Sequence, residues 1–295
     1  MTSPQTVESF YLTAVSELNA AELSFGHGCA CAEDEAAWLI SATLDIPFDA
    51  LDNARAQQLT AEELQQLTHN LQERCTKKTP LAYILGEAWL GPYCFKVDSR
   101  VIVPRSFIAE LLMDDLAPWV QSPEQITRIA DICTGSGCLA IIAALHFPNA
   151  QVDAVDLSLD ALSVATENVS AYQLQNRLTL HHGDLMAPVL DQKYDIIISN
   201  PPYVDAVSMD ALPEEYRHEP EMALAGGNDG LDLVHTLLRQ AAQTLNPGGW
   251  LIVEIGHNRE VMDAAYPNLP LVWLDTDGGN DFVFLIDHAS LQTLI

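Results

Sequence analysis

Short apolar segments alternate with helix-sized segments from residue 126 to near the end of this 295-residue chain, and the alternation limits the fold more than any other feature. The strand-like segments are 126–132, 151–156, 178–182, 194–199, 250–255, 271–274 and 282–286. The helical segments are 139–146, 159–172 and 231–245. Strands joined by helices pair in parallel and carry helices on both faces. The pattern therefore predicts an α/β fold with a doubly wound sheet, which binds ligands at the carboxyl ends of its strands.

The first 80 residues have a helical pattern instead. Apolar residues recur at helical spacing over 7–15, an acidic cluster opens a second helix, and Thr60 with Glu63 forms a capping box before a third. Apolar runs then flank the turn signal Gly91-Pro92, which predicts a β-hairpin over 81–97. We therefore predict three parts, which are a helical substrate-recognition domain, a linker with the hairpin, and the α/β domain, over 1–80, 81–104 and 105–295.

The most informative local motif is Asn200-Pro201-Pro202-Tyr203, which directly follows the strand-like segment 194–199. The two prolines fix φ and remove two backbone donors, so nearby carbonyls are free to accept hydrogen bonds. The asparagine amide adds an oxygen acceptor, and the tyrosine adds a flat ring. Such a rigid set of acceptors suits a planar –NH2 group, although Asn-Pro is also an ordinary turn starter.

A glycine turn follows the first strand-like segment. Its Gly135-x-Gly137-x-x-Ala140 pattern, with Asp156 further on, satisfies the dinucleotide fingerprint, so this motif alone leaves NAD(P) and S-adenosylmethionine open. The carboxylate of Asp131, just before the turn, would repel a pyrophosphate and attract an ammonium or sulfonium group. A hydride-transfer enzyme also has no obvious need for the acceptor motif after the fourth strand. We therefore expect S-adenosylmethionine as the cofactor.

The chain is strongly acidic, with 13 lysines and arginines against 41 acidic residues and a formal net charge of −28. A phosphate backbone repels such a surface, and Lys77-Lys78 is the only adjacent basic pair, so we expect no binding to duplex DNA or bare RNA. The acidity has two interpretations. It is a solvating surface suited to a salty habitat, or it attracts a basic protein partner.

Other sequence features bound the location and the metal content. No apolar run approaches the roughly 20 residues that a membrane span needs, and no basic and apolar signal segment opens the chain. Six cysteines, two of them in the glycine turn, fit a reducing compartment. We therefore expect a cytoplasmic protein with no membrane partner. His27-x-Cys29-x-Cys31 is spaced too tightly for zinc and lacks a second ligand pair, so we predict no metal.

The stretch 204–230 shows no clear periodicity and directly follows the asparagine-proline motif. It holds one base, Arg217, against seven acids: Asp205, Asp210, Glu214, Glu215, Glu219, Glu221 and Asp229. Loops of this length in a compact domain are commonly lids or binding loops, so we expect it to contact the substrate. Arg105 has two open roles, which are holding an acidic loop residue in place or lining the substrate channel. His218 and Arg217 share these alternatives.

These motifs together resemble the HemK/PrmC and PrmB group of protein-glutamine methyltransferases, from about residue 34 to the C-terminus, and the PrmB branch most closely. The Asn-Pro-Pro-Tyr motif is shared with adenine-N6 and guanine-N2 methyltransferases, so it marks amino-group chemistry and not the substrate. The segment Pro104-Arg105-Ser106 resembles the PrmB branch, whereas release-factor enzymes have Pro-Arg-Pro there. Leu90 departs from the branch, which usually has phenylalanine. Further segments that resemble this branch are Glu87-Ala88-Trp89, Phe25-Gly26-His27-Gly28 and residues 215–221.

The resemblance implies a Rossmann-like methyltransferase sheet and S-adenosylmethionine-dependent methylation of a glutamine side-chain amide on a basic, large-subunit ribosomal protein. It implies that the turn Cys133-Thr134-Gly135-Ser136-Gly137 wraps the methionine part of the cofactor and that Asp131 attracts its ammonium. Asp156 would accept from the ribose hydroxyls, and Asp184 with Leu185 would hold the adenine. The alternatives are a release-factor Gly-Gly-Gln methyltransferase, a nucleic-acid amino-methyltransferase, a non-catalytic assembly factor and an NAD-dependent oxidoreductase.

For catalysis, the resemblance assigns roles to Asn200, Pro201, Pro202 and Tyr203. The Asn200 side-chain oxygen and the Pro201 carbonyl would accept the two amide hydrogens and steer the nitrogen toward the sulfonium methyl. Asn200 would thereby also contact the cofactor, while Pro202 and Tyr203 would pack the amide plane. No general base is required before attack, because a proton can leave as charge develops on nitrogen.

Overall fold

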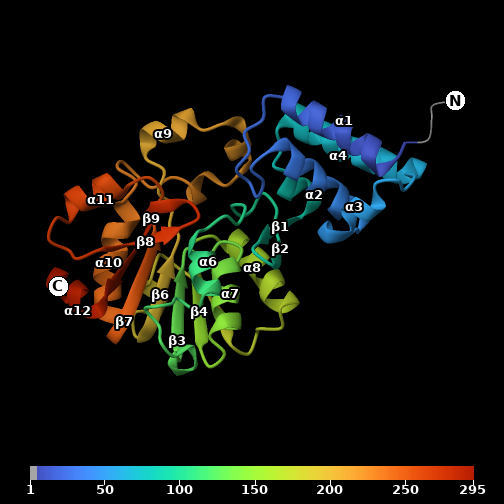
Figure 1. Ribbon diagram of the computed structural model, residues 1–295. Coiled ribbons are helices and arrows are strands. Elements are labelled where there is room, and N and C mark those ends of the chain that lie inside the picture. The colour runs from blue at the N-terminus through green and yellow to red at the C-terminus, as the bar shows by residue number, and fades with distance from the viewer. Residues whose placement is uncertain (1–4) are drawn as a thin grey trace.

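The computed structural model describes residues 5–295. The chain has a group of helices at its N-terminal end, a short hairpin, and a large sheet flanked by helices (Figure 1). The N-terminal helices are α1 (Val7–Ala20), α2 (Ala32–Leu44), α3 (Leu51–Ala54), α4 (Ala61–Lys77) and α5 (Leu81–Leu85). The hairpin strands are β1 (Glu87–Leu90) and β2 (Tyr93–Lys96). The strands of the large sheet are β3 (Arg128–Ile132), β4 (Gln151–Asp156), β5 (Leu178–His182), β6 (Tyr194–Ser199), β7 (Leu245–Glu254), β8 (Val272–Thr276) and β9 (Gly279–Asp287). The remaining helices are α6 (Ile108–Met113), α7 (Cys138–His146), α8 (Leu159–Ala171), α9 (Ala206–Ala211), α10 (Asp232–Thr244), α11 (Arg259–Ala265) and α12 (His288–Leu291).

Local sequence signals and a shared core together build the N-terminal helices. The predicted capping box opens α4, where the Glu63 N–H donates to the Thr60 hydroxyl and the Thr60 N–H donates to the Glu63 carboxylate. The buried faces of α1, α2, α4 and α5 share one apolar core, which continues into α8 through Ala161 and Val164. The N-terminal helices therefore pack directly against the half of the molecule that contains the large sheet.

The predicted strand conformation over 81–85 is wrong, because this stretch is the short helix α5. Gly86 ends the helix with a left-handed φ of 75°. Leu81 and Ala82 are buried in the core of the N-terminal helices, and this burial outweighs the β preference of the aromatic and β-branched residues nearby. The predicted hairpin itself is confirmed, and its first strand begins at Glu87.

The large sheet has the strand order β5-β4-β3-β6-β7-β9-β8. Neighbouring strands from β5 to β7 are parallel, whereas β9 runs antiparallel to both β7 and β8. The chain order reverses between β3 and β6, so the loops that follow these two strands diverge and leave room for a ligand. The predicted α/β fold with a doubly wound sheet is confirmed, and the antiparallel pair closes one edge.

Side chains of the central strands alternate between two cores, one on each face of the sheet. In β6, Ile196 and Ile198 belong to the core that α6 and α7 cover, while Ile197 belongs to the core that α10 covers. All three side chains are completely buried. Because both faces need apolar side chains, these strands read as continuous apolar runs, which is typical of parallel sheets.

The stretch 204–230 contains α9 and two short 3-10 turns, Glu214–His218 and Glu221–Ala223, and it reaches from the sheet toward the N-terminal helices (Figure 1). Its two ends pair with each other. The Val204 N–H donates to the Leu224 carbonyl at 2.9 Å, and the Gly226 N–H donates to the Val204 carbonyl at 2.8 Å. We call residues 205–224 the strap.

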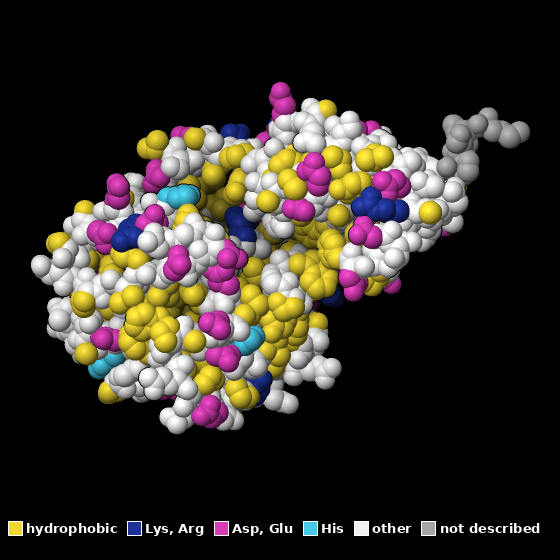
Figure 2. Space-filling model, viewed as in Figure 1, with side chains coloured by type: hydrophobic (Ala, Val, Ile, Leu, Met, Phe, Trp, Pro, Cys, Tyr) yellow, Lys and Arg dark blue, Asp and Glu magenta, His cyan; other side chains and the backbone are white. Residues whose placement is uncertain are grey.

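The surface of the molecule is hollowed between its two halves. Figure 2 shows hydrophobic side chains along this hollow and acidic side chains spread over the surrounding face. Within residues 5–295, no helix is both long enough and apolar enough to cross a bilayer. In the same part of the chain, no three His, Cys, Asp or Glu side chains are grouped so as to hold a metal ion.

Candidate active site

A pocket opens beyond the carboxyl ends of β3, β4 and β6, where the strand order reverses. It encloses about 690 Å³ when its open mouth and the adjoining solvent space are included. The predicted site residues that line it are Cys133, Gly135, Asp156, Asp184, Leu185, Asn200 and Pro202. The predicted site residues outside its walls are Asp131, Thr134, Ser136, Gly137, Pro201 and Tyr203.

Other wall residues lie outside the set of predicted site residues. Ser158 lines the pocket at the N-cap of α8, and Arg100 lines it from the segment after the hairpin. Pro220, Met222 and Ala223 bring the strap into the wall. A serine at a helix N-cap directly after a strand can be recognised from the sequence, so Ser158 could have been predicted. The strap residues belong to the stretch 204–230, which was expected to contact the substrate, although its individual wall residues carry no local signal. Arg100 carries none either, because only the tertiary fold brings it here.

The glycine turn is built from residues in the left-handed region. Cys133, Gly135 and Gly137 have φ angles of 64°, 55° and 80°. A Cβ at Gly135 would meet no atom within 4 Å, so a ligand in the pocket can approach this backbone closely. A Cβ at Gly137 would lie 3.3 Å from the Cβ of Ala165, so this glycine allows the start of α7 to pack on α8. One glycine therefore opens the pocket and the other fixes the turn.

Asp131 is fully buried at the end of β3. Its Oδ2 accepts from the Thr134 hydroxyl at 2.5 Å and from the Ala140 N–H at 3.0 Å. Its Oδ1 is buried and has no hydrogen-bond partner in the described part of the chain. Burial raises the pKa of Asp131 to about 7. A bound ammonium group would supply both the missing donor and the missing positive charge, so this carboxylate fits the cationic end of a ligand.

Asp156, at the end of β4, connects the glycine turn with the start of α8. Its Oδ2 accepts from the Gly135 N–H at 2.8 Å, and its Oδ1 accepts from the Ser158 N–H at 2.8 Å. Burial raises the pKa of Asp156 above its ordinary value. A carboxylate oxygen can accept more than one hydrogen bond, so both oxygens could also accept from ligand hydroxyls. Asp184 lies on the same pocket wall and is exposed.

The Asn200 turn combines free acceptors with a fixed tyrosine. Asn200 and Pro202 are half-buried on the pocket wall, and within residues 5–295 no hydrogen bond joins the Asn200 side chain to another residue. The Tyr203 carbonyl accepts from the Asn258 side-chain amide at 2.7 Å. A Cβ at Gly256, whose φ is 56°, would lie 2.5 Å from the Tyr203 ring, so only glycine lets the ring pack there. The loop after β7 thus holds the turn while its acceptors stay available.

Asn168 on α8 is a positioning residue that the sequence pattern did not indicate. Its Oδ1 accepts from the Lys96 N–H at 2.8 Å, and its Nδ2 donates to the Lys96 carbonyl at 3.0 Å and the Ser136 carbonyl at 2.9 Å. The side chain is almost completely buried. One amide therefore joins the hairpin to the glycine turn, over 72 and 32 positions in the sequence.

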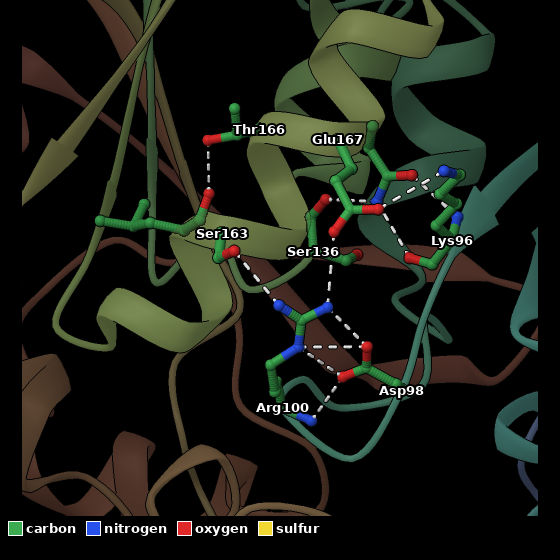
Figure 3. Close-up of polar contacts among 9 residues, drawn as sticks. Lys96, Asp98, Arg100, Ser136, Ser163, Thr166 and Glu167 are labelled. Carbon is green, nitrogen blue, oxygen red and sulfur yellow. Dashed lines mark hydrogen bonds and ion pairs between the residues drawn. The ribbon is translucent and has the colours of Figure 1, made fainter.

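Arg100 stands next to this contact and faces α8 (Figure 3). Its Nη2 donates to the Asp98 carboxylate at 2.6 Å, and its Nη1 donates to the Ser163 hydroxyl at 3.2 Å. The Glu167 carboxylate lies 3.5 Å from Nη2. The guanidinium is therefore matched by protein carboxylates, and its contacts hold the segment after the hairpin against α8.

Of the two roles open for Arg105, the structure shows the first. Its Nη1 and Nη2 donate to the two carboxylate oxygens of Glu219 on the strap, at 2.6 and 2.7 Å. His218 lies with its Nε2 2.9 Å from the Lys77 carbonyl. Of the seven acids in the stretch 204–230, Glu215 and Glu219 are buried and bonded within the chain.

Glu254, at the end of β7, joins this strand to the segment after Arg105, and its burial makes the stability of the protein depend on pH. The carboxylate is almost completely buried and accepts from the Ser106 hydroxyl at 2.6 Å and the Phe107 N–H at 2.9 Å. Burial raises the pKa of Glu254 to about 7 from 4.5. As the pH rises from 4.5 to 7, the unfolded chain therefore releases a proton that the folded chain retains, and the folded state loses stability.

Because Gln resembles the protonated acid, Glu254→Gln is expected to stabilise the protein relative to wild type at pH 8 and not at pH 4.5. The raised pKa of Glu254 corresponds to a gain in unfolding free energy of up to about 3 kcal/mol at pH 8. Urea unfolding of both proteins at several pH values measures it. A difference in unfolding free energy that stays the same from pH 4.5 to pH 8 would contradict the pKa of this group.

Two family models match separate parts of the chain. A model of the PrmC N-terminal domain matches residues 18–86, and a model of the Methyltransferase small domain matches residues 109–215. The hMettl16 catalytic domain, solved in complex with MAT2A 3′UTR hairpin 1, superposes with a TM-score of 0.53 at 12% identity, over 80% of this chain and 84% of that one. At this identity the likeness shows the fold alone.

Curated relatives match over much more of their length. A ribosomal protein uL3 glutamine methyltransferase of Neisseria meningitidis serogroup B is 51% identical over 286 residues, which cover 97% of this chain and 94% of the relative. The protein of the same name in Bordetella pertussis is 51% identical, with 98% and 97% covered. That of Bradyrhizobium diazoefficiens is 46% identical, with 97% and 92% covered. With such identity over nearly the full length of both partners, the chain belongs to the family of ribosomal protein uL3 glutamine methyltransferases.

Proposed function

We propose that this chain transfers a methyl group from S-adenosylmethionine to the side-chain amide nitrogen of a glutamine in ribosomal protein uL3, in the cytoplasm. The proposal rests on one observation above all: Asn200 and Pro202 share a single pocket with Gly135 and Asp156. The names of the relatives supply the substrate. Amino-group methylation needs both an acceptor turn and a glycine turn at one pocket, whereas an assembly factor that only binds protein needs neither.

Bound S-adenosylmethionine would supply an electrophilic methyl group on a sulfonium. We assign its ammonium to Asp131, whose buried Oδ1 has no other partner within residues 5–295. Asp156, Asp184 and Leu185 line the pocket. Asp156 would accept from the ribose hydroxyls, and Asp184 with Leu185 would hold the adenine. The residues that enclose the methionine part are Cys133, Thr134, Gly135, Ser136 and Gly137.

The protein's own part in the reaction is to position a weak nucleophile. The lone pair of a carboxamide nitrogen is conjugated with its carbonyl, so the amide must be held with that nitrogen facing the methyl group. The Asn200 side-chain oxygen and the Pro201 carbonyl accept the two amide hydrogens. Pro202 and Tyr203 would pack against the amide plane. As the nitrogen–methyl bond forms and the sulfur–methyl bond breaks, positive charge would develop on nitrogen and one amide proton would pass to solvent water.

The three parts of the chain have separate tasks in this proposal. The helical part, 1–80, recognises the protein substrate, residues 81–104 link the parts, and residues 105–295 carry the transfer. Ribosomal proteins are basic, and the net charge of −28 favours such a partner over a nucleic acid. We infer that a protein segment would lie in the hollow between the two halves (Figure 2) on its way to the pocket.

A methyl-transfer assay with labelled S-adenosylmethionine tests the function. We expect label on purified uL3, and none on uL3 in which the modified glutamine, located by mass spectrometry, is replaced by alanine. Release factor and ribosomal RNA serve as parallel acceptors and should stay unlabelled. Label on release factor or RNA in preference to uL3 would contradict the substrate while leaving the methyl-transfer chemistry intact.

A further inference from the structure

The strap is anchored at its far end by a buried carboxylate. The Glu219 side chain is completely enclosed and accepts from both terminal nitrogens of Arg105 and from the Val103 N–H at 2.9 Å. The Nε2 of His27, from the N-terminal part, lies 3.7 Å from the same carboxylate. The Tyr216 ring contacts His27, with 4.5 Å between ring centroids, and the Arg105 guanidinium lies 5.3 Å from the centre of the Tyr216 ring.

A second buried carboxylate fixes the strap to the N-terminal helices. Glu215 accepts from the Ser24 N–H at 2.8 Å and from Nη1 of Arg74, on α4, at 3.2 Å. Arg74 also donates through Nε to Glu35 on α2 at 2.5 Å, and its side chain is only 3% exposed. The partners of Glu215 lie 191 and 141 positions away in the sequence, so these contacts join the two halves of the molecule.

The same strap forms part of the pocket. Pro220, Met222 and Ala223 follow the anchored residues directly and line the wall. At the base of the strap, the Val204 N–H bonds the Leu224 carbonyl, and Val204 is the next residue after Tyr203. A displacement of residues 219–224 would therefore move the pocket wall and the segment that pairs with Val204, next to Tyr203.

We propose that Glu215 and Glu219 are positioning residues, through which the N-terminal helices and the Arg105 segment hold the strap in the geometry that the pocket requires. The proposal rests on the function proposed above for that pocket. Buried ion pairs are costly to desolvate, and well-packed apolar groups of similar volume serve stability equally well or better. What a bonded carboxylate adds is one defined position for the backbone that carries it. The segments 25–28 and 215–221, which both resemble the PrmB branch in sequence, meet at this cluster.

A matched pair of variants tests the proposal, because Glu215 and Glu35 bond the same arginine. Glu215→Gln weakens the link between the strap and α4, whereas Glu35→Gln makes the same chemical change within the N-terminal helices. We expect Glu215→Gln to lower kcat/KM for uL3 at least about tenfold and to weaken S-adenosylmethionine binding severalfold. We expect Glu35→Gln to change both quantities less than about twofold, even where the two variants lose similar thermal stability.

Hydrogen exchange gives a readout that does not depend on activity. Glu215→Gln should accelerate amide exchange throughout 205–226, while Glu35→Gln should accelerate it only in α2 and α4. If the wild-type protein does not methylate uL3 but strap exchange is still faster in Glu215→Gln, the positioning role is sustained and only the proposed function is contradicted. Equal kinetic losses in both variants, or an unchanged strap in Glu215→Gln, would overturn the positioning role. Glu215→Asp, which keeps the charge on a shorter side chain, carries the same expectations if Glu215→Gln does not fold.

Discussion

Replacing Asn200 with alanine is expected to lower the methyl-transfer rate by about 10² to 10³-fold while the affinity for S-adenosylmethionine stays within about threefold of wild type. Loss of one preorganised polar group at a reacting centre typically has this effect on turnover. Asn200 lines the pocket, and its side chain bonds no other residue within 5–295, so its removal leaves the packing of the turn intact. The cofactor contacts assigned to Asp131 and Asp156 also remain.

Single-turnover methyl transfer and isothermal titration calorimetry separate the two quantities. Asn19→Ala, at an exposed position on α1, is the matched control and should behave as wild type in both measurements. A second comparison is Asn258→Ala, which frees the Tyr203 carbonyl and should have a smaller effect than Asn200→Ala, because the acceptor itself is retained. Equal losses of turnover and of cofactor affinity in Asn200→Ala would refute the assigned role.

Replacing Arg105 with methionine is expected to destabilise the protein by about 3–5 kcal/mol, because it leaves the Glu219 charge buried without its ionic partner. The Glu219 side chain is fully enclosed, whereas Arg105 is 20% exposed, so the main cost falls on the carboxylate that stays behind. Burial alone would raise the pKa of Glu219, but the charge and hydrogen bonds of Arg105 outweigh it and lower the pKa to about 2. The stabilisation is thus present above pH 4.5 and is lost as the pH falls toward 2.

Urea unfolding of wild type, Arg105→Met, Glu219→Gln and the double variant at pH 7 measures the coupling between the two side chains. We expect the double variant to recover part of the stability that Arg105→Met loses, since no buried charge remains in it. Arg55→Ala is the control, because Arg55 is also paired with acidic side chains, those of Glu8 and Asp52, but at an exposed site. If Arg105→Met costs no more than Arg55→Ala, the buried pair does not hold the strap.

Local patterns in the sequence were enough to predict the sheet and the meeting point of the site. Continuous apolar runs and helical spacing depend on nearest neighbours along the chain, and they indicated the strands and helices of the large sheet. Carboxyl ends of parallel strands must share one edge, so Gly135, Asp156 and Asn200 could be expected at one pocket before any coordinates were known. The same reasoning was wrong over 81–85, where burial among the N-terminal helices decided the conformation.

The sequence by itself thus determined the α/β class, the doubly wound sheet and the pair of turns that form the pocket, because each follows from residues close together in the chain. Only the tertiary structure decided how those turns are held. Asn168 joins the glycine turn to the hairpin, Glu254 joins β7 to the Arg105 segment, and Glu215 joins the strap to α4, across 32 to 148 positions. A hydrogen bond requires donor and acceptor atoms about 3 Å apart, and local sequence patterns do not indicate which residues far apart in the chain will come that close.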